Sequence, residues 1–331
     1  LFAAVDAYAK AWTENEKAEK GFLEYIENPA KVSFPWSMID KITPRPDASV
    51  KKMLEDAGFT DTESIVTSKN TYVAPFVNAE EAQYLVIENA FPNGRPALEN
   101  AGVMFTSRET VEKVERMKVC TCLNPLHTAL AVYGCLLGYT KISDEMKDAD
   151  LVKLVEIIGY KEGLPVVTDP GILSPKKFID EVLQIRVPNP FMPDTPQRIA
   201  CDTSQKLSIR FGETIKEYMA SSELDVKSLK FIPMVQAGWC RYLLGVDDEL
   251  NAFTVSPDPM YEELAGKLAG VKVGESCDVH AVLSPILSDA KIFGVNLYEA
   301  GLGEYVESIF AELIAGKGAV RETLKRHLAE A

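Results

Sequence analysis

The chain has 331 residues, of which 47% are hydrophobic and 25% are charged, proportions that are typical of a folded globular protein and exclude a disordered one. Its 35 lysines and arginines stand against 49 acidic residues, and the resulting formal charge of −14 disfavours nucleic acids and anionic membrane surfaces, because both attract basic proteins. No uninterrupted apolar run approaches the ~20 residues of a membrane helix, and no leader-like segment opens the sequence. We therefore expect a cytoplasmic protein.

The first hundred residues predict short helices, an extended segment and a small β element. Apolar residues recur at helical spacing over 2–12 and 17–27, whereas the prolines of 34–46 impose an extended or turn-like segment. Asp47 is a predicted cap for a helix over 48–57 that ends at Gly58. Residues 71–77 and 83–88 are the predicted strands, and no βαβ series accompanies them.

After Ser107 the pattern is almost wholly helical. Ser174 before Pro175 and Thr195 before Pro196 are N-cap signals. The predicted fold class is mainly α with a small β element, divided into lead-in helices over 1–30 and one helical domain over 31–331. The predicted helices cover 108–122, 126–138, 144–158, 175–185, 196–219, 230–244, 259–268 and 301–328, the last broken near Gly316.

The patterns of common cofactor and metal sites are missing from the sequence. Gly301-Leu302-Gly303 is the nearest match to a dinucleotide loop, but it lacks the third glycine and follows no predicted strand. Six cysteines are too few for a disulfide scaffold and predict buried thiols in a reducing compartment. Three histidines form no metal-binding spacing, so we expect chemistry without a metal.

The strongest chemical signal is the set Lys118, Asn124 and His127, which lies in a mainly apolar stretch of sequence. Pro125 lacks an N–H and disfavours a helical Asn124, so we expect one helix to end near Cys122 and a second to begin with Asn124 as N-cap. Two helices meeting there can direct all three side chains at one point. A desolvated lysine can act as a general acid toward an alkoxide, and an asparagine amide can stabilise an oxyanion.

Each of these residues also has a structural explanation. Asn124 can be only a cap, His127 a satisfied core residue, and Lys118 a surface residue with its stem buried. A second signal, Arg198, Asp202 and Lys206 at i, i+4 and i+8, predicts one helix face that forms either an ion-pair ladder or a substrate-binding surface.

Asp40 is similarly open to two interpretations. It lies in an apolar stretch between prolines, where an aspartate can form a turn or can interact with a catalytic lysine.

Three segments together resemble the mannitol dehydrogenase family, the polyol-specific long-chain dehydrogenases. Residues 34–44 are similar to the family's F-P-x-S-M-V-D-R-I-T-P signature, residues 123–130 to its L-N-x-x-H-x-x-L segment, and residues 198–206 to its R-x-x-x-D-x-S-x-K helix. The resemblance runs in family order from the first residue to about residue 245. It implies a helical C-terminal domain like that of 6-phosphogluconate dehydrogenase.

The resemblance also implies roles for the residues. Lys118 would be the catalytic acid/base, Asn124 an oxyanion donor, and His127 a ligand of a substrate hydroxyl. Arg198 and Lys206 would bind substrate, and Asp40 would tune or relay protons near Lys118. Lys118 stands six positions before Asn124, where five are expected, so a bulge or tight turn must absorb one residue.

The resemblance implies NAD as cofactor, bound mainly by an N-terminal Rossmann domain that we expect upstream of Leu1, so that this chain alone would be inactive. The expected reaction interconverts a ketose or keto sugar acid and its reduced form. Lys41 and Arg45 favour D-fructuronate and D-mannonate, with mannitol 2-dehydrogenase or tagaturonate reductase activity as alternatives. Two other classes remain open: a non-catalytic sugar-acid binding or assembly module, and a metal-dependent dehydratase or hydrolase.

Overall fold

The computed structural model describes residues 1–44, 46–192 and 194–331. Helices dominate it, as predicted, and the chain divides into two compact units. Unit 1 comprises Leu1–Ile42 and Glu81–Glu115, and unit 2 comprises Thr43–Glu80 and Arg116–Ala331. These units divide the chain elsewhere than at residue 30, because strands of residues 37–40 and 84–88 pair with each other.

Unit 1 combines two helices with a small sheet. Helices α1 (Phe2–Glu14) and α2 (Phe22–Glu27) confirm the predicted lead-in helices. Strands β1 (Ser37–Asp40), β4 (Tyr84–Glu88) and β5 (Met104–Thr106) form a sheet in the order β1-β4-β5, antiparallel and then parallel. Along β1 exposed and buried residues alternate, and Met38 and Asp40 lie on its buried face.

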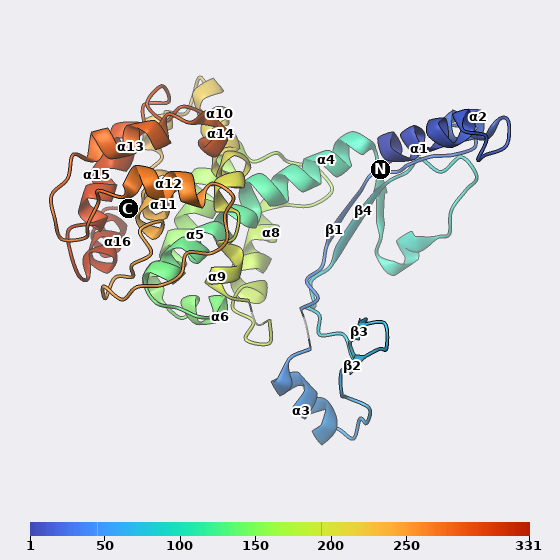
Figure 1. The fold of residues 1–331 in the computed structure, drawn as a ribbon, viewed down its shortest axis with the longest axis horizontal. Helices are drawn as coiled ribbons and strands as arrows, with labels where there is room; N and C mark the ends of the chain where they lie inside the picture. The colour runs from blue at the N-terminus through green and yellow to red at the C-terminus, as the bar shows by residue number, and fades with distance from the viewer. Residues whose placement is uncertain (45, 193) are drawn as a thin grey trace. The chain divides into compact units, whose positions relative to one another are not determined.

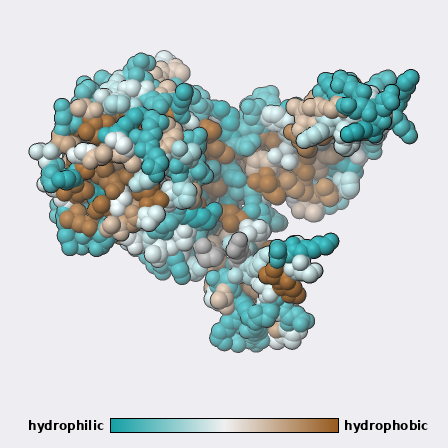
Figure 2. Space-filling model, viewed as in Figure 1, coloured by the Kyte–Doolittle hydropathy of each residue, from teal (hydrophilic) through white to brown (hydrophobic). Residues whose placement is uncertain are grey.

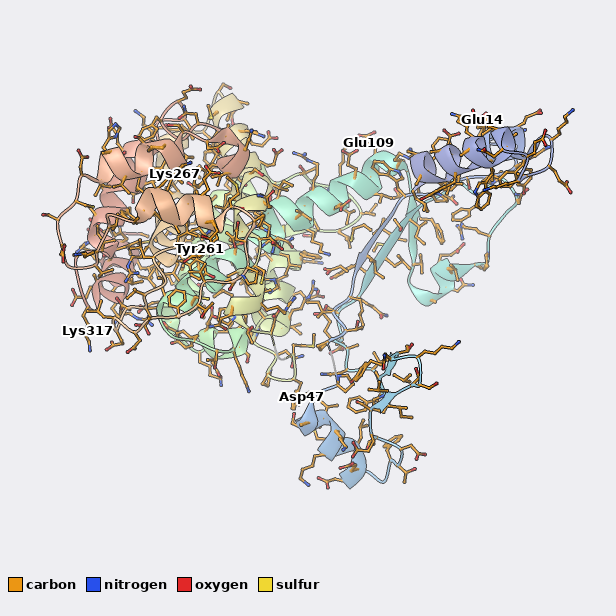
Figure 3. The ribbon with its side chains drawn as sticks, in the orientation of Figure 1. Glu14, Asp47, Glu109, Tyr261, Lys267 and Lys317 are labelled. Carbon is orange, nitrogen blue, oxygen red and sulfur yellow. The ribbon has the colours of Figure 1, made fainter. Side chains whose placement is uncertain are left out.

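The segment before unit 2's helical body carries one helix and one hairpin. Helix α3 (Ala48–Asp56) begins after Asp47, labelled in Figure 3, whose carboxylate accepts the backbone N–H groups of Ser49 and Val50, as predicted. Strands β2 (Ile65–Val66) and β3 (Tyr72–Val73) pair antiparallel. The predicted strand over 71–77 is therefore short, and it does not join the strand over 83–88, which pairs with β1 and β5 instead.

The body of unit 2 is a set of packed helices (Figure 1). Helix α4 (Arg108–Met117), most of which belongs to unit 1, leads through a π-helical turn, η2 (Lys118–Cys122), into α5. Three further π-helical turns among the described residues are η3 (Ile157–Gly163), η5 (Val182–Arg186) and η7 (Ser208–Gly212). The remaining α-helices are α5 (Asn124–Leu136), α6 (Ile142–Glu145), α7 (Ala149–Glu156), α8 (Pro175–Glu181), α9 (Pro196–Ile199), α10 (Glu213–Ala220), α11 (Phe231–Tyr242), α12 (Tyr261–Leu268), α13 (Val279–Leu287), α14 (Ala290–Phe293), α15 (Gly303–Leu313) and α16 (Ala319–Ala329).

Helices α5 and α11 form the centre of this body. Tyr133 on α5 and Trp239 on α11 are fully buried, and α11 packs against both α5 and α15. Burial of such side chains contributes roughly 1.5–3 kcal/mol each to stability. Figure 2 shows hydrophilic residues over much of the visible face, with hydrophobic patches between them.

One helical run has the length and composition of a membrane span. It extends over Arg108–Leu136, and 83% of its most apolar window is buried inside the structure. The apolar character of that window is therefore explained by its burial inside the folded chain.

Local signals predicted several helix boundaries correctly. Ser174 and Thr195 accept the backbone N–H groups of Lys177 and Arg198, and α15 and α16 are separated at Gly316 as predicted. Tyr261 and Lys267, labelled in Figure 3, lie on α12 inside the predicted helix 259–268.

Two of the predicted helices were wrong as continuous helices, and two helices were not predicted. The predicted helix 144–158 is interrupted by Asp148, which caps α7. Helices α13 and α14 were missed. The predicted helix 196–219 is divided into α9, the 3₁₀ turn η6 (Thr203–Gln205), the π-helical turn η7 (Ser208–Gly212) and α10. Asp202 breaks it, because its φ of 52° is left-handed and incompatible with a continuing helix.

Candidate functional site

Lys118 is the first residue of the π-helical turn η2. The backbone N–H of Leu123 donates to the carbonyl of Lys118 at 3.0 Å, the i to i+5 bond that defines such a turn. A π-helical turn accommodates one more residue than an α-helical turn, so it supplies the bulge expected between Lys118 and Asn124. Lys118 itself is partly buried.

Helix α5 begins one residue earlier than predicted. Leu123 is the N-cap and Asn124 the first helical residue, so the prediction of Asn124 as N-cap was wrong. Pro125 occupies the second position, where its missing N–H costs no helical hydrogen bond. The Asn124 amide is therefore not used in capping, and it lies partly exposed beside the π-helical turn.

His127, one turn into α5, is surrounded by charged groups. Burial lowers its pKa to about 4; Asp194 acts in the opposite direction, and Arg186, Arg210 and Arg198 lower the pKa further. The imidazole is consequently neutral at pH 7, with one ring nitrogen able to donate and the other to accept a hydrogen bond.

Arg198 and Lys206 do not share a helix face, because the helix is broken at Asp202, so the predicted i, i+4, i+8 ladder was wrong. Arg198 instead donates to both carboxylate oxygens of Asp194, at 2.6 and 2.5 Å. The Lys206 ammonium donates to the carbonyl of Cys201. Burial lowers the pKa of Lys206, and the nearby Arg210 and Arg198 lower it further.

The structure nevertheless brings these predicted residues together. Arg198 lies within electrostatic reach of both His127 and Lys206. Lys118 and Asn124 come from the helical run that carries His127, and η7 packs against both η2 and α5. We call His127, Arg186, Arg198, Lys206 and Arg210 the cationic cluster. Asp40 is buried at the end of β1 in unit 1, so its predicted relation to Lys118 stays a prediction.

Sequence reasoning missed two arginines of the cationic cluster. Arg186, from η5, donates to both carboxylate oxygens of Glu80 at 2.9 Å in a pair whose side chains are each 3% exposed. Arg210, from η7, donates to the Thr128 hydroxyl at 2.7 Å. A signal for Arg210 was available, since it continues the four-residue spacing of Arg198, Asp202 and Lys206.

Other features of the described residues lie away from this cluster. A groove of about 850 Å³ in unit 1 is lined by Phe2, Phe34 and Trp36 among others, and by none of the predicted site residues. Within the part of the chain that the structure describes, no three His, Cys, Asp or Glu residues group as a metal site. All six cysteines are described and none forms a disulfide, as predicted. Arg45 lies outside the described residues.

A family model described as "Mannitol dehydrogenase C-terminal domain" matches residues 110–309, which include the cationic cluster. This chain belongs to the mannitol dehydrogenase family. A relative from Thermotoga maritima, named D-mannonate oxidoreductase, is 57% identical over 98% of this chain and 60% of its own length. A mannitol 2-dehydrogenase from Aspergillus niger is 31% identical over 80% of this chain and 51% of its own length.

Solved structures of family members share the fold. Pseudomonas fluorescens mannitol 2-dehydrogenase, in a ternary complex with NAD and D-mannitol, aligns with a TM-score of 0.69 and 26% identity over 94% of this chain and 57% of its own. A D-sorbitol dehydrogenase in substrate-free form aligns with a TM-score of 0.73 and 26% identity over 92% of this chain and 57% of its own. The chain therefore spans between about half and three-fifths of the length of these relatives.

Proposed function

We propose that the protein is an NAD(H)-dependent oxidoreductase that interconverts D-fructuronate and D-mannonate. The observation that carries the proposal is the cationic cluster, because three arginines act on a neutral His127 and two of them also act on Lys206. Such a gathering of cationic side chains in a chain of charge −14 suits an anionic sugar acid. The Thermotoga maritima relative's name, D-mannonate oxidoreductase, supports the same substrate. Lys41 supported this choice from the sequence, and it lies in unit 1.

NADH, when bound, supplies the hydride that reduces the ketone carbon. The segment Gly301-Leu302-Gly303, the nearest sequence match to a dinucleotide-binding loop, does not fit a pyrophosphate. Gly303 opens α15, and a Cβ there would lie 2.4 Å from the Tyr298 ring, so this glycine allows close packing within the body. We assign only substrate-side chemistry to the described residues.

The proton step is assigned to Lys118. As hydride reaches the carbonyl carbon, the ketone oxygen gains negative charge, and the Lys118 ammonium donates a proton to it, leaving a neutral amine and a secondary alcohol. In the oxidative direction the neutral amine takes the hydroxyl proton. The Asn124 amide donates a hydrogen bond to the same oxygen, and Asp40 is proposed to tune Lys118.

The remaining predicted residues orient the substrate. Neutral His127 exchanges hydrogen bonds with a substrate hydroxyl, and Arg198 and Lys206 hold the polyhydroxy chain. We propose no metal in the reaction, so a chelator should leave the rate unchanged.

The test is a substrate comparison on the purified protein as the cell produces it, with NADH and D-fructuronate, D-tagaturonate or D-fructose. The highest kcat/KM is expected for fructuronate. Faster reduction of fructose than of either uronate would contradict a sugar-acid substrate. Faster reduction of tagaturonate would favour the related reductase activity, and D-mannonate binding without turnover would favour a binding module.

A further inference from the structure

Arg210 is a half-buried residue of the π-helical turn η7. Its one hydrogen bond within the described residues is from Nη1 to the Thr128 hydroxyl at 2.7 Å. A guanidinium has five N–H donors, so most of its donor capacity is unused. Burial lowers its pKa to about 10, which leaves it protonated at neutral pH.

The arginines of the cationic cluster differ in how their charge is compensated. Arg186 is paired with Glu80, and Arg198 is paired with Asp194. Within the described residues Arg210 has no acidic partner. A guanidinium that is partly withdrawn from water and has no counter-charge gains from an anionic partner, so this arrangement favours an anion at the site.

Another buried arginine of the same body shows what a structural role looks like. Arg241 on α11 is fully buried, and its guanidinium donates to the backbone carbonyls of Leu313, Val246 and Asp247. Those bonds satisfy it without a ligand. Arg210 has no comparable set of carbonyl acceptors among the described residues, so an interior structural role does not account for it.

The position of Arg210 places an anion beside the proposed substrate groups. Its partner Thr128 follows His127 in α5, and Arg210 lies within electrostatic reach of His127 and Lys206. Its unused N–H groups form a planar fork that matches the two oxygens of a carboxylate. We propose that Arg210 binds the carboxylate of the sugar-acid substrate and sets the preference for uronates over neutral ketoses, an inference that rests on the proposed function.

The test compares Arg210→Gln with the unchanged protein on D-fructuronate and D-fructose, with NADH. Loss of one charge-assisted carboxylate contact should lower kcat/KM for fructuronate by about 10- to 100-fold, with little change for fructose, which has no carboxylate. Arg210→Lys keeps a positive charge but not the planar fork, so its kcat/KM for fructuronate should lie between those of the unchanged protein and Arg210→Gln. Arg326→Gln is the control, because Arg326 is an exposed arginine paired with Glu312. This variant should leave kcat/KM unchanged for both substrates.

A second measurement reports binding without turnover. D-Mannonate should raise the melting temperature of the unchanged protein more than mannitol does, and Arg210→Gln should abolish that difference while retaining a cooperative transition. Equal losses on fructuronate and fructose, or an unchanged preference for mannonate in the thermal shift, would overturn the role of Arg210. Absence of turnover in the unchanged protein would overturn the proposed function instead, and the thermal shift would still decide the role of Arg210.

Discussion

Lys118 shows how a single residue depends on local backbone geometry. In a straight α-helix, residues 118 and 127 differ by nine positions and point about opposite ways. The π-helical turn over Lys118–Cys122 and the irregular Leu123, with φ −130° and ψ −62°, change that relation. π-Helical turns are frequent at functional sites, and this one coincides with the residue to which we assign the proton step.

Replacement of Lys118 tests that assignment. Lys118→Ala should lower kcat by about 10²- to 10⁴-fold, the range for loss of a general acid, with an unchanged melting temperature. Lys113→Ala is the matched control, because Lys113 lies on α4 in an exposed pair with Glu109, labelled in Figure 3. Near-normal turnover by Lys118→Ala would move the acid/base role to another group.

At the scale of elements, a carboxylate from one helix caps another. Glu162, in the π-helical turn η3, accepts the backbone N–H groups of Lys230, Phe231 and Ile232 at 2.6, 2.8 and 2.8 Å. Helix α11 has no capping side chain of its own. Glu162 therefore satisfies the N–H groups at the start of the most buried helix and favours its positive dipole end.

Truncation of the Glu162 side chain should destabilise the folded protein. Glu162→Ala leaves buried N–H groups without acceptors and should lower the free energy of unfolding by about 2–4 kcal/mol. Glu162→Gln, which keeps one oxygen acceptor, should lose less. Chemical denaturation measures both, with exposed Glu156→Ala as the control. A loss no larger than that of the control would show that α11 is held by packing alone.

At the scale of the whole molecule, one buried acid makes stability depend on pH. Glu145 is fully buried, and neither of its carboxylate oxygens has a hydrogen-bond partner among the described residues. Burial raises its pKa from 4.5 to about 9, with contributions from Asp148 and Asp194. The folded state thus holds a proton that the unfolded state releases above about pH 4.5, so this contribution to stability falls as pH rises toward 9.

Glu145→Gln removes this titration while keeping the side chain's size. The free energy of unfolding of the unchanged protein should fall relative to that of the variant as pH rises from 5 to 9, by on the order of a few kcal/mol in all. Denaturation at several pH values measures the difference between the two curves. Parallel curves would show that Glu145 does not titrate in this range.

Local features were predictable because their causes lie within a few residues. Asp47, Ser174 and Thr195 cap the helices that follow them, and the apolar spacing of α5 and α11 predicted helices in their places. The order of the family segments was also visible in the sequence alone. Those observations determined the helical fold class, the family and most of the candidate site.

The tertiary structure decided which groups meet and which charges are compensated. It broke the predicted helix at Asp202, gave Arg198 the partner Asp194 and Arg186 the partner Glu80, and left Arg210 without an acid among the described residues. It also paired β1 with β4 across more than forty residues of sequence. Such contacts depend on the burial and charge of segments far apart in the chain, and periodicity, which reports only neighbours along the chain, does not contain them.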